Sequence, residues 1–524
     1  MSDTLNALLD SSAARWPART ALLVEEGRQD ERAVSYAELL ARVLRAAALL
    51  RSRGIRKGDR VALLQRNGLG FVAAYFGLAR LGAAAVPINF MIQKPEELRY
   101  MLQDCGAKAL LTQRAFLREA LRAKEGLEGL STVWVMDGGA AGGEDFWRAA
   151  KACAPYDGAG EALEGDTAAV LYTSGTTGKP KGIMLTHANL ISNSDAAIRS
   201  FQVSQSDVFP CLLPMFHTFA WTACVLVPLR LGARIIVVSS ITPPKPWLSR
   251  MARHRATIFV AVPQLYALLA KQASGLKRLL LRWWFFRGVR FCVSGAGPLP
   301  ARVAADFERK LGLRILEGYG LTETSPVVSV NPPQRPRPGS VGPPIEGVRL
   351  RIVDDAGRVL PAGQEGEICV AGPAVMKGYF GRPGETREVL SEDGWLKTGD
   401  IGLLDAEGYL YVRDRKKDMI IVKGLKVFPA QVEEEILSHP DVGEAAVVGV
   451  PDEAGDEIVK AYVVLKPGAS ADKAALMRHC RRRLDAYKRP RDLEIVAELP
   501  KNSLQKVLKR LLREQAIQKS GGLR

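Results

Sequence analysis

The chain reads YTSGTTGKPKG at residues 172–182, between an apolar run that is expected to form a strand and a helical pattern that Thr186 can cap. Glycines let backbone N–H groups approach an anion closely, and hydroxyl and ammonium groups add donors and positive charge. The residues of this kind are Thr173, Ser174, Gly175, Thr176, Thr177, Gly178, Lys179, Lys181 and Gly182. The spacing of a Walker loop is absent, because a proline follows Lys179. We therefore predict a polyphosphate-binding loop of a different type.

Alternating helical and strand patterns extend outward from this loop in both directions. Ser35 and Glu38 form the capping-box pattern of a helix that ends near Gly54, and the apolar run 60–64 follows it. Further apolar runs occur at 168–172, 234–238, 256–260 and 289–293. This alternation predicts an α/β fold with a large N-terminal domain of layered, largely parallel sheets and packed helices.

Two segments interrupt the alternation. Residues 138–160 are rich in glycine and alanine and are expected to form a surface loop. The prolines of residues 331–344 cannot continue a helix or a central strand. Beyond them the pattern changes to short strands, with candidates at 366–370 and 409–412.

The charged run RDRKKD at 413–418 marks the expected domain boundary. Beyond it a helical pattern opens at Pro429, and strand patterns cover 445–450 and 459–465. We therefore predict an N-terminal domain at 1–413, a hinge at 414–418 and a small α+β C-terminal domain at 419–524.

The composition of the 524 residues excludes several classes of protein. With 47% hydrophobic and 25% charged residues, the chain is not expected to be disordered or fibrous. No run approaches the roughly 18 apolar residues of a membrane span, and the polar start MSDTLNALLD predicts a cytoplasmic protein. Seven scattered cysteines without a CxxC pair argue against a disulfide framework or a zinc site. The formal charge of +17 favours polyanionic partners, but no recognisable nucleic-acid module accompanies it.

Five further motifs follow the loop in order. They are VSGAGPL (293–299), EGYGLTET (317–324), WLKTGD (395–400), DRKKDMI (414–420) and PKNSLQK (500–506). With the loop, they resemble the AMP-forming acyl-CoA synthetases, adenylation domains and luciferases over nearly the whole chain. The resemblance implies a two-step reaction that uses ATP, Mg²⁺ and coenzyme A. A carboxylate attacks the α-phosphate of ATP to give an acyl-adenylate and pyrophosphate, and the thiol of coenzyme A then gives a thioester and AMP.

The resemblance also implies nucleotide-binding residues in the loop and in four of these motifs. They are Thr173, Ser174, Gly175, Thr176, Thr177, Gly178, Lys181, Gly295, Ala296, Gly318, Tyr319, Gly320, Thr322, Asp400 and Arg415. Tyr319 can place its ring against adenine where glycine neighbours permit close approach. The hydroxyl of Thr322 suits the α-phosphate, and the hard carboxylate oxygens of Glu323 suit Mg²⁺. Asp400 can accept from both ribose hydroxyls, and Arg415 matches a second ribose contact.

Lys506 is the expected catalytic cation. The adenylation transition state gathers negative charge between the acid oxygen and the α-phosphate, which a lysine of a mobile domain can neutralise. The family pattern usually has glycine before this lysine, whereas Gln505 stands here. Lys417 matches the hinge about which the small domain swings, and the same swing would bring Gly424 toward coenzyme A.

The segment LPMFHTFAW resembles the family's acyl pocket, with His217 at its mouth and Phe219 and Trp221 as lining. Together with EGYGLTETSPVVSVNP it looks most like medium- and long-chain fatty acyl-CoA ligases. The alternatives are an aryl or alicyclic acid–CoA ligase and transfer of the acyl group to a separate carrier protein. A non-catalytic sensor of lipid or nucleotide is a further class, but the retention of Lys506 argues against it.

Residues 276–290, LKRLLLRWWFFRGVR, interleave basic and aromatic side chains. We expect a surface helix that buries its aromatic side chains on the large domain. The alternative is a peripheral contact with anionic membrane, which would suit an enzyme that collects fatty acids from a bilayer. No nucleic-acid partner is expected, and the sequence leaves the oligomeric state open.

Overall fold

The structure is a computed structural model that describes residues 4–26, 30–92, 94–173, 179–422, 425–451, 457–501 and 507–521. The chain forms two compact units. Unit 1 comprises Met1–Leu350 and Val370–Leu396, and unit 2 comprises Arg351–Cys369 and Lys397–Arg524. The predicted hinge at 414–418 falls inside unit 2, and the predicted division of the chain at that hinge stays a prediction.

The largest sheet of unit 1 has eight strands in the order β18-β9-β8-β4-β3-β5-β6-β7. The strands from β8 to β7 run parallel, whereas β9 is antiparallel to both of its neighbours. Their bounds are β3 Arg60–Leu64, β4 Ala84–Pro87, β5 Ala109–Thr112, β6 Thr132–Val135, β7 Glu144–Asp145, β8 Thr167–Thr173, β9 Lys181–Thr186 and β18 Gly378–Tyr379. The predicted strand 60–64 is confirmed.

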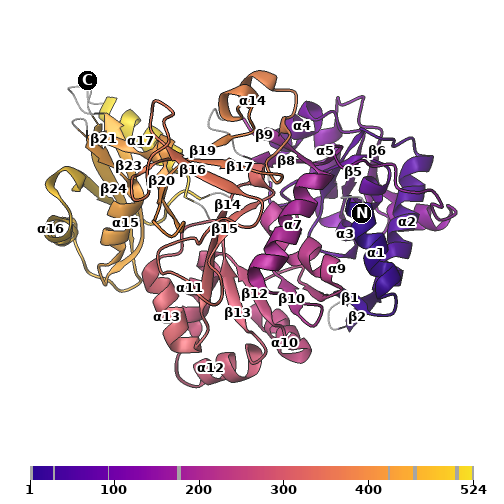
Figure 1. Cartoon of the computed structure of the whole chain (residues 1–524), viewed down its shortest axis with the longest axis horizontal. Helices are drawn as coiled ribbons and strands as arrows, with labels where there is room; N and C mark the ends of the chain where they lie inside the picture. Colours follow the sequence, from indigo (N-terminus) through magenta and orange to yellow (C-terminus); the bar gives the residue numbers. More distant parts are fainter. Residues whose placement is uncertain are drawn as a thin grey trace. The chain divides into compact units, whose positions relative to one another are not determined.

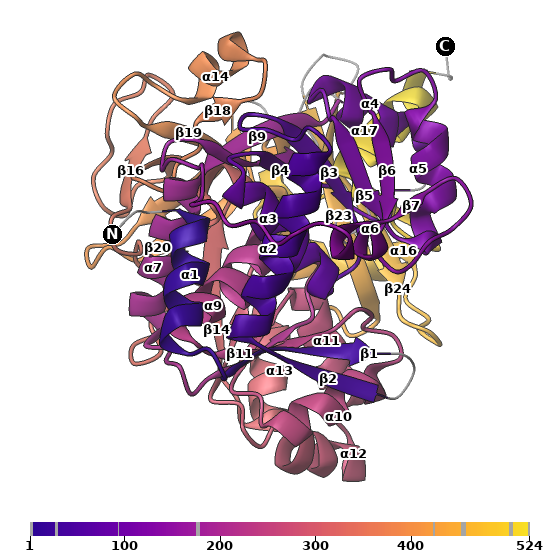
Figure 2. The same cartoon turned by 90° about the vertical axis from the view of Figure 1, so that its right-hand side faces the viewer.

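Helices cover both faces of this sheet, and β3 shows why. Its residues Val61 and Leu63 belong to one core, whereas Ala62 and Leu64 belong to another. Successive side chains of a strand point to opposite faces. The first core includes α2 and α3, which lie side by side in Figure 2, and the second includes α4 and α5. The helix bounds are α1 Leu5–Arg15, α2 Tyr36–Ser52, α3 Leu69–Arg80, α4 Pro95–Asp104, α5 Leu117–Lys124 and α6 Phe146–Lys151.

Helix α2 has the boundaries that its sequence predicts. The Ser35 hydroxyl accepts a hydrogen bond from the Glu38 backbone N–H, and the Glu38 carboxylate accepts one from the Ser35 N–H, which completes the capping box. At the other end Gly54 adopts a φ of +85°, the left-handed conformation that glycine tolerates after a helix.

Two four-stranded sheets complete unit 1, with the orders β10-β11-β1-β2 and β12-β13-β14-β15. Their bounds are β1 Thr20–Glu26, β2 Asp30–Ser35, β10 Val208–Cys211, β11 Arg234–Val237, β12 Ile258–Ala261, β13 Phe291–Ser294, β14 Ile315–Gly320 and β15 Val327–Val330. The remaining helices of the unit are α7 His187–Phe201, α8 Thr218–Trp221, α9 Val227–Leu231, α10 Pro244–His254, α11 Pro263–Gln272, α12 Gly275–Leu280, α13 Ala301–Leu311 and α14 Pro383–Val389. Figure 1 shows α10, α12 and α13 around these sheets.

Two predictions near the glycine-rich segment are wrong in detail. The segment does not lead directly into a helix, because β9 intervenes and pairs antiparallel with β8. Thr186 caps α7 as predicted, but β9 separates the glycine-rich segment from this helix. Residues 138–160 are not wholly a loop, since they contain β7 and α6, whose N-terminus is capped by Asp145.

Unit 2 contains smaller elements. A four-stranded sheet has the order β16-β17-β19-β20, a three-stranded sheet has the order β23-β24-β25, and β21 pairs with β22. Their bounds are β16 Arg349–Val353, β17 Gly366–Ala371, β19 Leu396–Leu404, β20 Leu410–Arg415, β21 Ile420–Val422, β22 Leu425–Val427, β23 Val442–Pro451, β24 Glu457–Leu465 and β25 Asp492–Ile495. The helices are α15 Pro429–Leu437, α16 Lys473–Arg483 and α17 Lys509–Gly521. The predicted opening of a helix at Pro429 is confirmed.

The segment 276–290 corrects a further expectation. Trp283 and Trp284 are 68% and 52% exposed, so they are not buried on the large domain. The helix α12 continues into the π-helical turn η3, Leu281–Phe285, and the residues of the segment that reach the core are Leu281, Phe286 and Val289. Within the parts of the chain that the structure describes, no helix is long and apolar enough to cross a bilayer.

Candidate active site

The two ends of the glycine-rich segment are fastened to α4. The hydroxyl of Tyr172, near the end of β8, donates a hydrogen bond of 2.6 Å to Asp104 Oδ2. On the other side, the hydroxyl of Tyr100 donates to the carbonyl oxygen of Pro180 at 3.1 Å. Arg382 donates to the Tyr100 hydroxyl at 2.8 Å and to Asp104 Oδ1 at 2.9 Å. This network fixes where the segment leaves and rejoins the sheet.

The segment itself is only partly described. Thr173 ends β8 and is half-buried, whereas Ser174, Gly175, Thr176, Thr177 and Gly178 lie outside the described residues. No sequence signal pointed to Asp104, Tyr100 or Arg382, because none of them belongs to a motif. Their partners are distant along the chain, and only the folded sheet brings them together.

Lys181 lies at the start of β9, beside residues of the chain from 370 to 396. It forms an ion pair with Glu385, and its ammonium lies 5.3 Å from the ring centroid of Tyr379. The Tyr379 hydroxyl donates to Glu323 Oε1 at 3.3 Å. Tyr379 therefore lies between the predicted phosphate-binding lysine and the predicted magnesium-binding carboxylate.

Glu323 belongs to the short 3₁₀ turn η4, Thr322–Thr324, and its backbone carbonyl accepts from the Met376 N–H at 2.8 Å. No group of three His, Cys, Asp or Glu side chains that could hold a metal ion occurs in the described ranges. Mg²⁺ in nucleotide enzymes is usually held by one or two carboxylates, with phosphate and water oxygens as the other ligands. Glu323 fits an ion that arrives with the nucleotide.

Tyr319 lies on β14 between two glycines, as the motif requires, but the glycines have a structural cause that the sequence did not reveal. A Cβ at Gly320 would lie 2.0 Å from the carbonyl oxygen of Pro326, and one at Gly318 would lie 3.2 Å from that of Ser329. Both contacts are to the backbone of the chain that pairs with β14. At least Gly320 is therefore required by the packing of this hairpin, whatever approaches Tyr319.

Gly295 and Ala296 follow β13 and face the predicted acyl segment. A Cβ at Gly295 would lie 2.9 Å from Cζ of Phe219, so the glycine gives room to the aromatic ring. Ala296 has a φ of +65°, which an L-residue adopts only at a cost of about 1 kcal/mol. Strain of this kind is concentrated at functional loops.

Glu317 is a residue of this site that motif matching alone did not single out. Its half-buried carboxyl accepts from the backbone N–H of Leu299, so it ties β14 to the loop that carries Gly295 and Ala296. Burial raises the pKa of Glu317 to about 7, and the Leu299 N–H offsets this only in part. The group therefore titrates near neutral pH. Glu317 is the first residue of the EGYGLTET motif and lies within β14, but no sequence signal indicated its contact with Leu299.

His217 stands immediately before α8 in apolar surroundings. Its ring centroid lies 4.8 Å from that of Phe216, and Nε2 has no hydrogen-bond partner among the described residues. Burial lowers the pKa of His217 to about 4, and no charged group contributes to the shift. The imidazole is therefore neutral at neutral pH.

Trp221 is more deeply placed than the prediction of a pocket wall implies. It is 2% exposed and stacks on Tyr75 with ring centroids 4.0 Å apart. The ring centroids of Phe71 and Phe76, both on α3, lie 5.7 Å and 5.9 Å from that of Trp221. Trp221 thus joins α8 to α3 within the core, and Phe219 is the aromatic residue of this segment that contacts the Gly295 loop.

In unit 2, the two predicted ribose contacts pair with each other. Asp400 and Arg415 lie directly opposite on the antiparallel strands β19 and β20. Arg415 Nε lies 2.7 Å from Asp400 Oδ1, and the Asp400 side chain is 4% exposed whereas that of Arg415 is 40% exposed. The structure thus brings together two residues that are 15 positions apart in the sequence and leaves the arginine accessible to a ligand.

The predicted hinge contains one anchored and one unanchored lysine. Lys416 Nζ lies 3.0 Å from Glu367 Oε2 and 3.4 Å from Asp355 Oδ1. Lys417, in contrast, is exposed, and no residue of the described chain forms a hydrogen bond or ion pair with its side chain. Gly424 lies outside the described residues.

Asp414, just before these lysines, has a role that its motif did not indicate. Its Oδ2 accepts from the backbone N–H of Ala430 at 2.7 Å. The N-cap residue of α15, Phe428, provides no side-chain acceptor, so Asp414 satisfies one of the free N–H groups at the start of that helix.

Lys506 lies outside the described residues, but the chain on either side is well anchored. Lys501 and Val507 form an antiparallel β-bridge, and Lys501 Nζ lies 2.7 Å from Glu444 Oε1. Lys509 Nζ lies 2.8 Å from Glu433 Oε1.

A cavity of about 520 Å³ opens in unit 1 beyond the carboxyl ends of β3, β4 and β5. The chain passes from β3 to β4 through α3 on one face and from β4 to β5 through α4 on the other, which makes this edge the kind of switch point where α/β sheets bind ligands. The guanidinium of Arg66 lies 5.9 Å and 5.8 Å from the ring centroids of Phe90 and Phe116. Lys94 and Arg118 add positive charge to the lining.

Tyr379 thus contacts both Lys181, which follows the glycine-rich segment, and Glu323 in unit 1, and a cation and a carboxylate on either side of one aromatic ring suit the binding of a nucleotide with its metal ion. The family model described as AMP-binding enzyme matches residues 9–380, and that of the AMP-binding enzyme C-terminal domain matches residues 431–506. The chain therefore belongs to the AMP-binding enzyme family. Its fold is that of AMP-forming ligases with a large N-terminal and a small C-terminal domain.

Characterised relatives are similar over almost their whole length. The chain is 34% identical to the long-chain-fatty-acid–CoA ligase of Bacillus subtilis (strain 168) over 547 aligned residues, covering 98% of this chain and 94% of that protein. It is 35% identical to the feruloyl-CoA synthase of an Amycolatopsis species over 503 residues, covering 94% and 97%. The crystal structure of ATP-bound MatB from Rhodopseudomonas palustris matches with a TM-score of 0.89 at 33% identity, covering 98% and 99%. The chain is an AMP-forming acyl-CoA ligase, and this family uses ATP, Mg²⁺ and coenzyme A.

Proposed function

We propose that the acid activated by this ligase is a medium- or long-chain fatty acid. The observation that carries the proposal is the uncharged environment of His217, whose pKa is shifted by burial alone. A neutral imidazole among Phe216, Phe219 and Ala220 suits an acid with an uncharged, apolar tail. An acid with a second ionised group would lose its hydration there without gaining a counter-charge.

An aryl acid is the second candidate. Phe219 fills the space left by Gly295, and Trp221 is packed into the core, which would favour a short, flat acid over a long chain. The chain is about equally similar to a feruloyl-CoA synthase and to a fatty acid ligase, so these similarities support the two candidates equally. Both candidates would lie in the uncharged surroundings of His217, and the length of the acid separates them.

We propose that this chain's residues promote adenylation by charge neutralisation and positioning. Glu323, oriented by the Tyr379 hydroxyl, would hold Mg²⁺, which neutralises phosphate charge when bound. Lys181 and the segment 173–178 would bind phosphate oxygens, with Tyr319 against the adenine and Thr322 near the α-phosphate. Asp400 would accept from the ribose hydroxyls, held in place by Arg415. Lys506 would neutralise the charge that develops between the acid and the α-phosphate.

We propose that thioester formation uses a second pose, reached by rotation at Lys417. The exposed, unpaired side chain of Lys417 would not resist that rotation, whereas Lys416 stays anchored by Glu367. The cavity lined by Arg66, Phe90 and Phe116 offers cations and aromatic faces to a phosphorylated adenine nucleotide such as that of coenzyme A. Gly424 would line the path of its thiol arm.

The decisive experiment incubates the purified protein with ATP, Mg²⁺ and one acid, with and without coenzyme A, and identifies products by mass spectrometry. The acids are octanoate, palmitate, benzoate, ferulate, cyclohexanecarboxylate and, as a doubly charged control, succinate. We expect AMP and a coenzyme-dependent thioester of octanoate or palmitate, and none of succinate. Preference for ferulate or benzoate would establish the aryl candidate. Adenylate without thioester would indicate a carrier protein as acceptor, and activity on succinate would contradict the uncharged pocket.

We also propose a peripheral contact with an anionic membrane, because a ligase for fatty acids gains from access to the bilayer in which such acids partition.

A further inference from the structure

Unit 1 carries an exposed apolar surface on α12 and η3. It consists of Leu276, Leu279, Leu280, Trp283 and Trp284, which are between 46% and 81% exposed and which we call the α12 patch. All eight tryptophans of the chain are described, and only Trp283 and Trp284 are exposed. Large apolar side chains gathered within nine residues of a surface helix indicate a surface that is covered in use.

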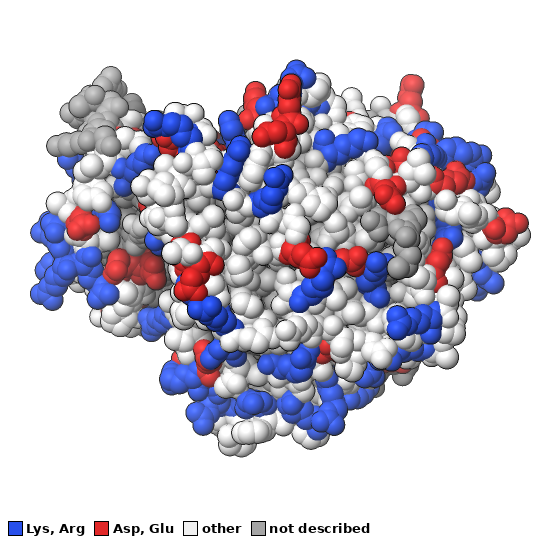
Figure 3. All heavy atoms as spheres, in the orientation of Figure 1, with Lys and Arg blue, Asp and Glu red and all other residues white. Residues whose placement is uncertain are grey.

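Cations surround the α12 patch. Lys277 and Arg278 are exposed on α12, and the guanidinium groups of Arg282 and Arg287 lie 4.9 Å and 4.8 Å from the ring centroids of Trp283 and Trp284. Within the described ranges, no carboxylate forms an ion pair with any of these four side chains. Figure 3 shows that lysine and arginine dominate the surface over α10, α12 and α13, with few acidic groups between them.

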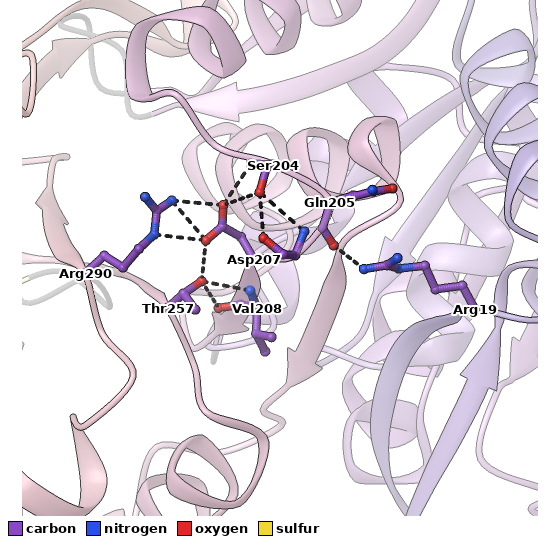
Figure 4. Close-up of polar contacts among 8 residues, drawn as sticks. Arg19, Ser204, Gln205, Asp207, Val208, Thr257 and Arg290 are labelled. Carbon is purple, nitrogen blue, oxygen red and sulfur yellow. Dashed lines mark hydrogen bonds and ion pairs between the residues drawn. The ribbon is translucent and has the colours of Figure 1, made fainter.

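Arg290, at the end of this segment, differs from the four cations of the patch. Its guanidinium donates to both carboxylate oxygens of Asp207, at 3.0 Å and 2.9 Å, and the Thr257 hydroxyl donates to the same group at 2.7 Å (Figure 4). Asp207 thus anchors the segment and neutralises Arg290. No aspartate or glutamate occurs at residues 208–305, which contain thirteen lysines and arginines.

We infer that the α12 patch docks the protein on an anionic phospholipid surface. Tryptophan is enriched at the interface between headgroups and acyl chains, leucines can enter the acyl boundary, and lysine and arginine attract anionic headgroups. A second copy of the chain would present the same unpaired cations and be repelled. A nucleic acid would pair with the cations but would leave three exposed leucines without apolar contact.

This inference rests on the proposed membrane contact and specifies its surface and its lipid chemistry. It does not depend on which acid the ligase activates, since vesicle binding is measured without ATP, acid or coenzyme A. A protein that binds vesicles but activates no acid would contradict the proposed function alone. A protein that activates an acid but does not bind vesicles would contradict this inference alone.

The test is co-sedimentation of the full-length protein with vesicles of phosphatidylcholine alone or of phosphatidylcholine and phosphatidylglycerol in equal parts. We expect at least about tenfold tighter binding to the anionic vesicles, weakened by added salt. The double variants Trp283→Ser/Trp284→Ser and Lys277→Glu/Arg278→Glu should each lose at least about tenfold in affinity, because each removes one of the two attractions. The side chains of Lys277, Arg278, Trp283 and Trp284 are all exposed. Both variants should therefore keep the wild-type unfolding midpoint and the wild-type activity on a water-soluble acid.

The matched control is Arg45→Glu/Arg148→Glu, at exposed positions of α2 and α6, which changes the net charge by the same amount as Lys277→Glu/Arg278→Glu. It should bind anionic vesicles within about twofold of the wild type. The inference is overturned if the wild-type protein ignores anionic vesicles, or if the control loses as much affinity as the α12 variants. It is also overturned if the wild-type protein is a dimer in lipid-free buffer that the tryptophan variant dissociates, which would make the patch a contact between copies.

Discussion

Arg415 and Asp400 face each other across β19 and β20, with 2.7 Å between Nε and Oδ1, and the aspartate is almost completely buried. A buried carboxylate that loses a charged donor retains its desolvation cost. We expect Arg415→Gln to lower the free energy of unfolding by about 1 to 3 kcal/mol and to raise the KM for ATP. Denaturant unfolding and initial rates measure the two effects.

Arg413→Gln is the control for this prediction. Arg413 lies on the same strand as Arg415, and its Nε is 2.8 Å from Glu365 Oε1. In this pair, however, both side chains are about one-third exposed. Exposed pairs contribute less than about 1 kcal/mol, so the control should cost little stability and leave the KM for ATP unchanged. Equal losses in the two variants would show that burial of Asp400 does not matter.

The role of Lys506 is tested by separating the two half-reactions. Lys506→Ala should reduce acid-dependent pyrophosphate release by at least about a hundredfold, the scale of removing a key electrostatic group, and still convert supplied acyl-adenylate to thioester. Lys501→Ala removes a neighbouring lysine that pairs with Glu444 and should leave pyrophosphate release nearly unchanged. A comparable loss of both half-reactions in Lys506→Ala would be inconsistent with a role confined to adenylation.

The hinge assignment predicts a difference between two substitutions of one residue. Lys417→Pro fixes φ and should therefore spare adenylation while blocking thioester formation from supplied acyl-adenylate. Lys417→Ala removes only a side chain that is exposed and unpaired, so both half-reactions should persist. Single-turnover measurements of each half-reaction decide the matter, and thioester synthesis at the wild-type rate in Lys417→Pro would refute the hinge.

Glu317 predicts a pH dependence of stability. Burial raises its pKa from 4.5 to about 7, so between these values the folded protein holds a proton that the unfolded chain has lost. The stability that this proton provides is fully present below the unfolded pKa and is lost as the pH rises through about 7. We expect the free energy of unfolding of the wild type to fall by about 3 kcal/mol relative to Glu317→Gln across this window. Denaturant unfolding at a series of pH values measures the difference.

Glu308→Gln is the control, because Glu308 is about half exposed and lies on the surface helix α13. Its stability curve should run parallel to that of the wild type. If the Glu317→Gln curve also ran parallel to the wild type, the carboxyl of Glu317 would have an ordinary pKa.

The cavity beside Arg66 predicts an effect on one substrate alone. Arg66→Ala should raise the KM for coenzyme A by about tenfold, the value of one charge-assisted contact with phosphate, and leave the KM for ATP unchanged. Arg122→Ala removes an exposed arginine of α5 outside the cavity lining and should change neither KM. Equal increases in the KM for ATP and for coenzyme A would place Arg66 outside the coenzyme site.

The sequence predicts those elements whose signal is local. The capping box of Ser35 and Glu38 defines α2, and the apolar run 60–64 coincides with β3. The strand β9 was missed because KGIMLT has little apolar alternation of its own, and its structure depends on pairing with β8. The helix α6 was missed because six residues in a stretch of glycine and alanine carry almost no periodicity.

The site shows the same division. Motifs indicated Asp400 together with its partner Arg415. They also indicated Lys181 and Glu323, but not the residues that orient these two side chains or anchor the glycine-rich segment. Glu385, Tyr379 and Asp104 are ordinary residues that reach the site only through tertiary packing. The exposure of Trp283 was predicted wrongly, because helical periodicity shows which side chains share a face but not whether anything covers that face.

If Lys417 is the hinge, as we propose, the contacts across it would affect how the enzyme divides its time between the two half-reactions. Asp355 precedes the proposed hinge, and its Oδ2 lies 3.2 Å from Nζ of Lys426, which follows the hinge. Asp414 also precedes the hinge and accepts a hydrogen bond from the Ala430 N–H beyond it. The rotation that we propose at Lys417 would have to exchange these contacts for others. Their strength would then set the dwell time of this pose. A single substitution at Asp355, a residue that no motif contains, would shift the balance between making the adenylate and consuming it, and offers a place where turnover can be adjusted without altering the catalytic groups.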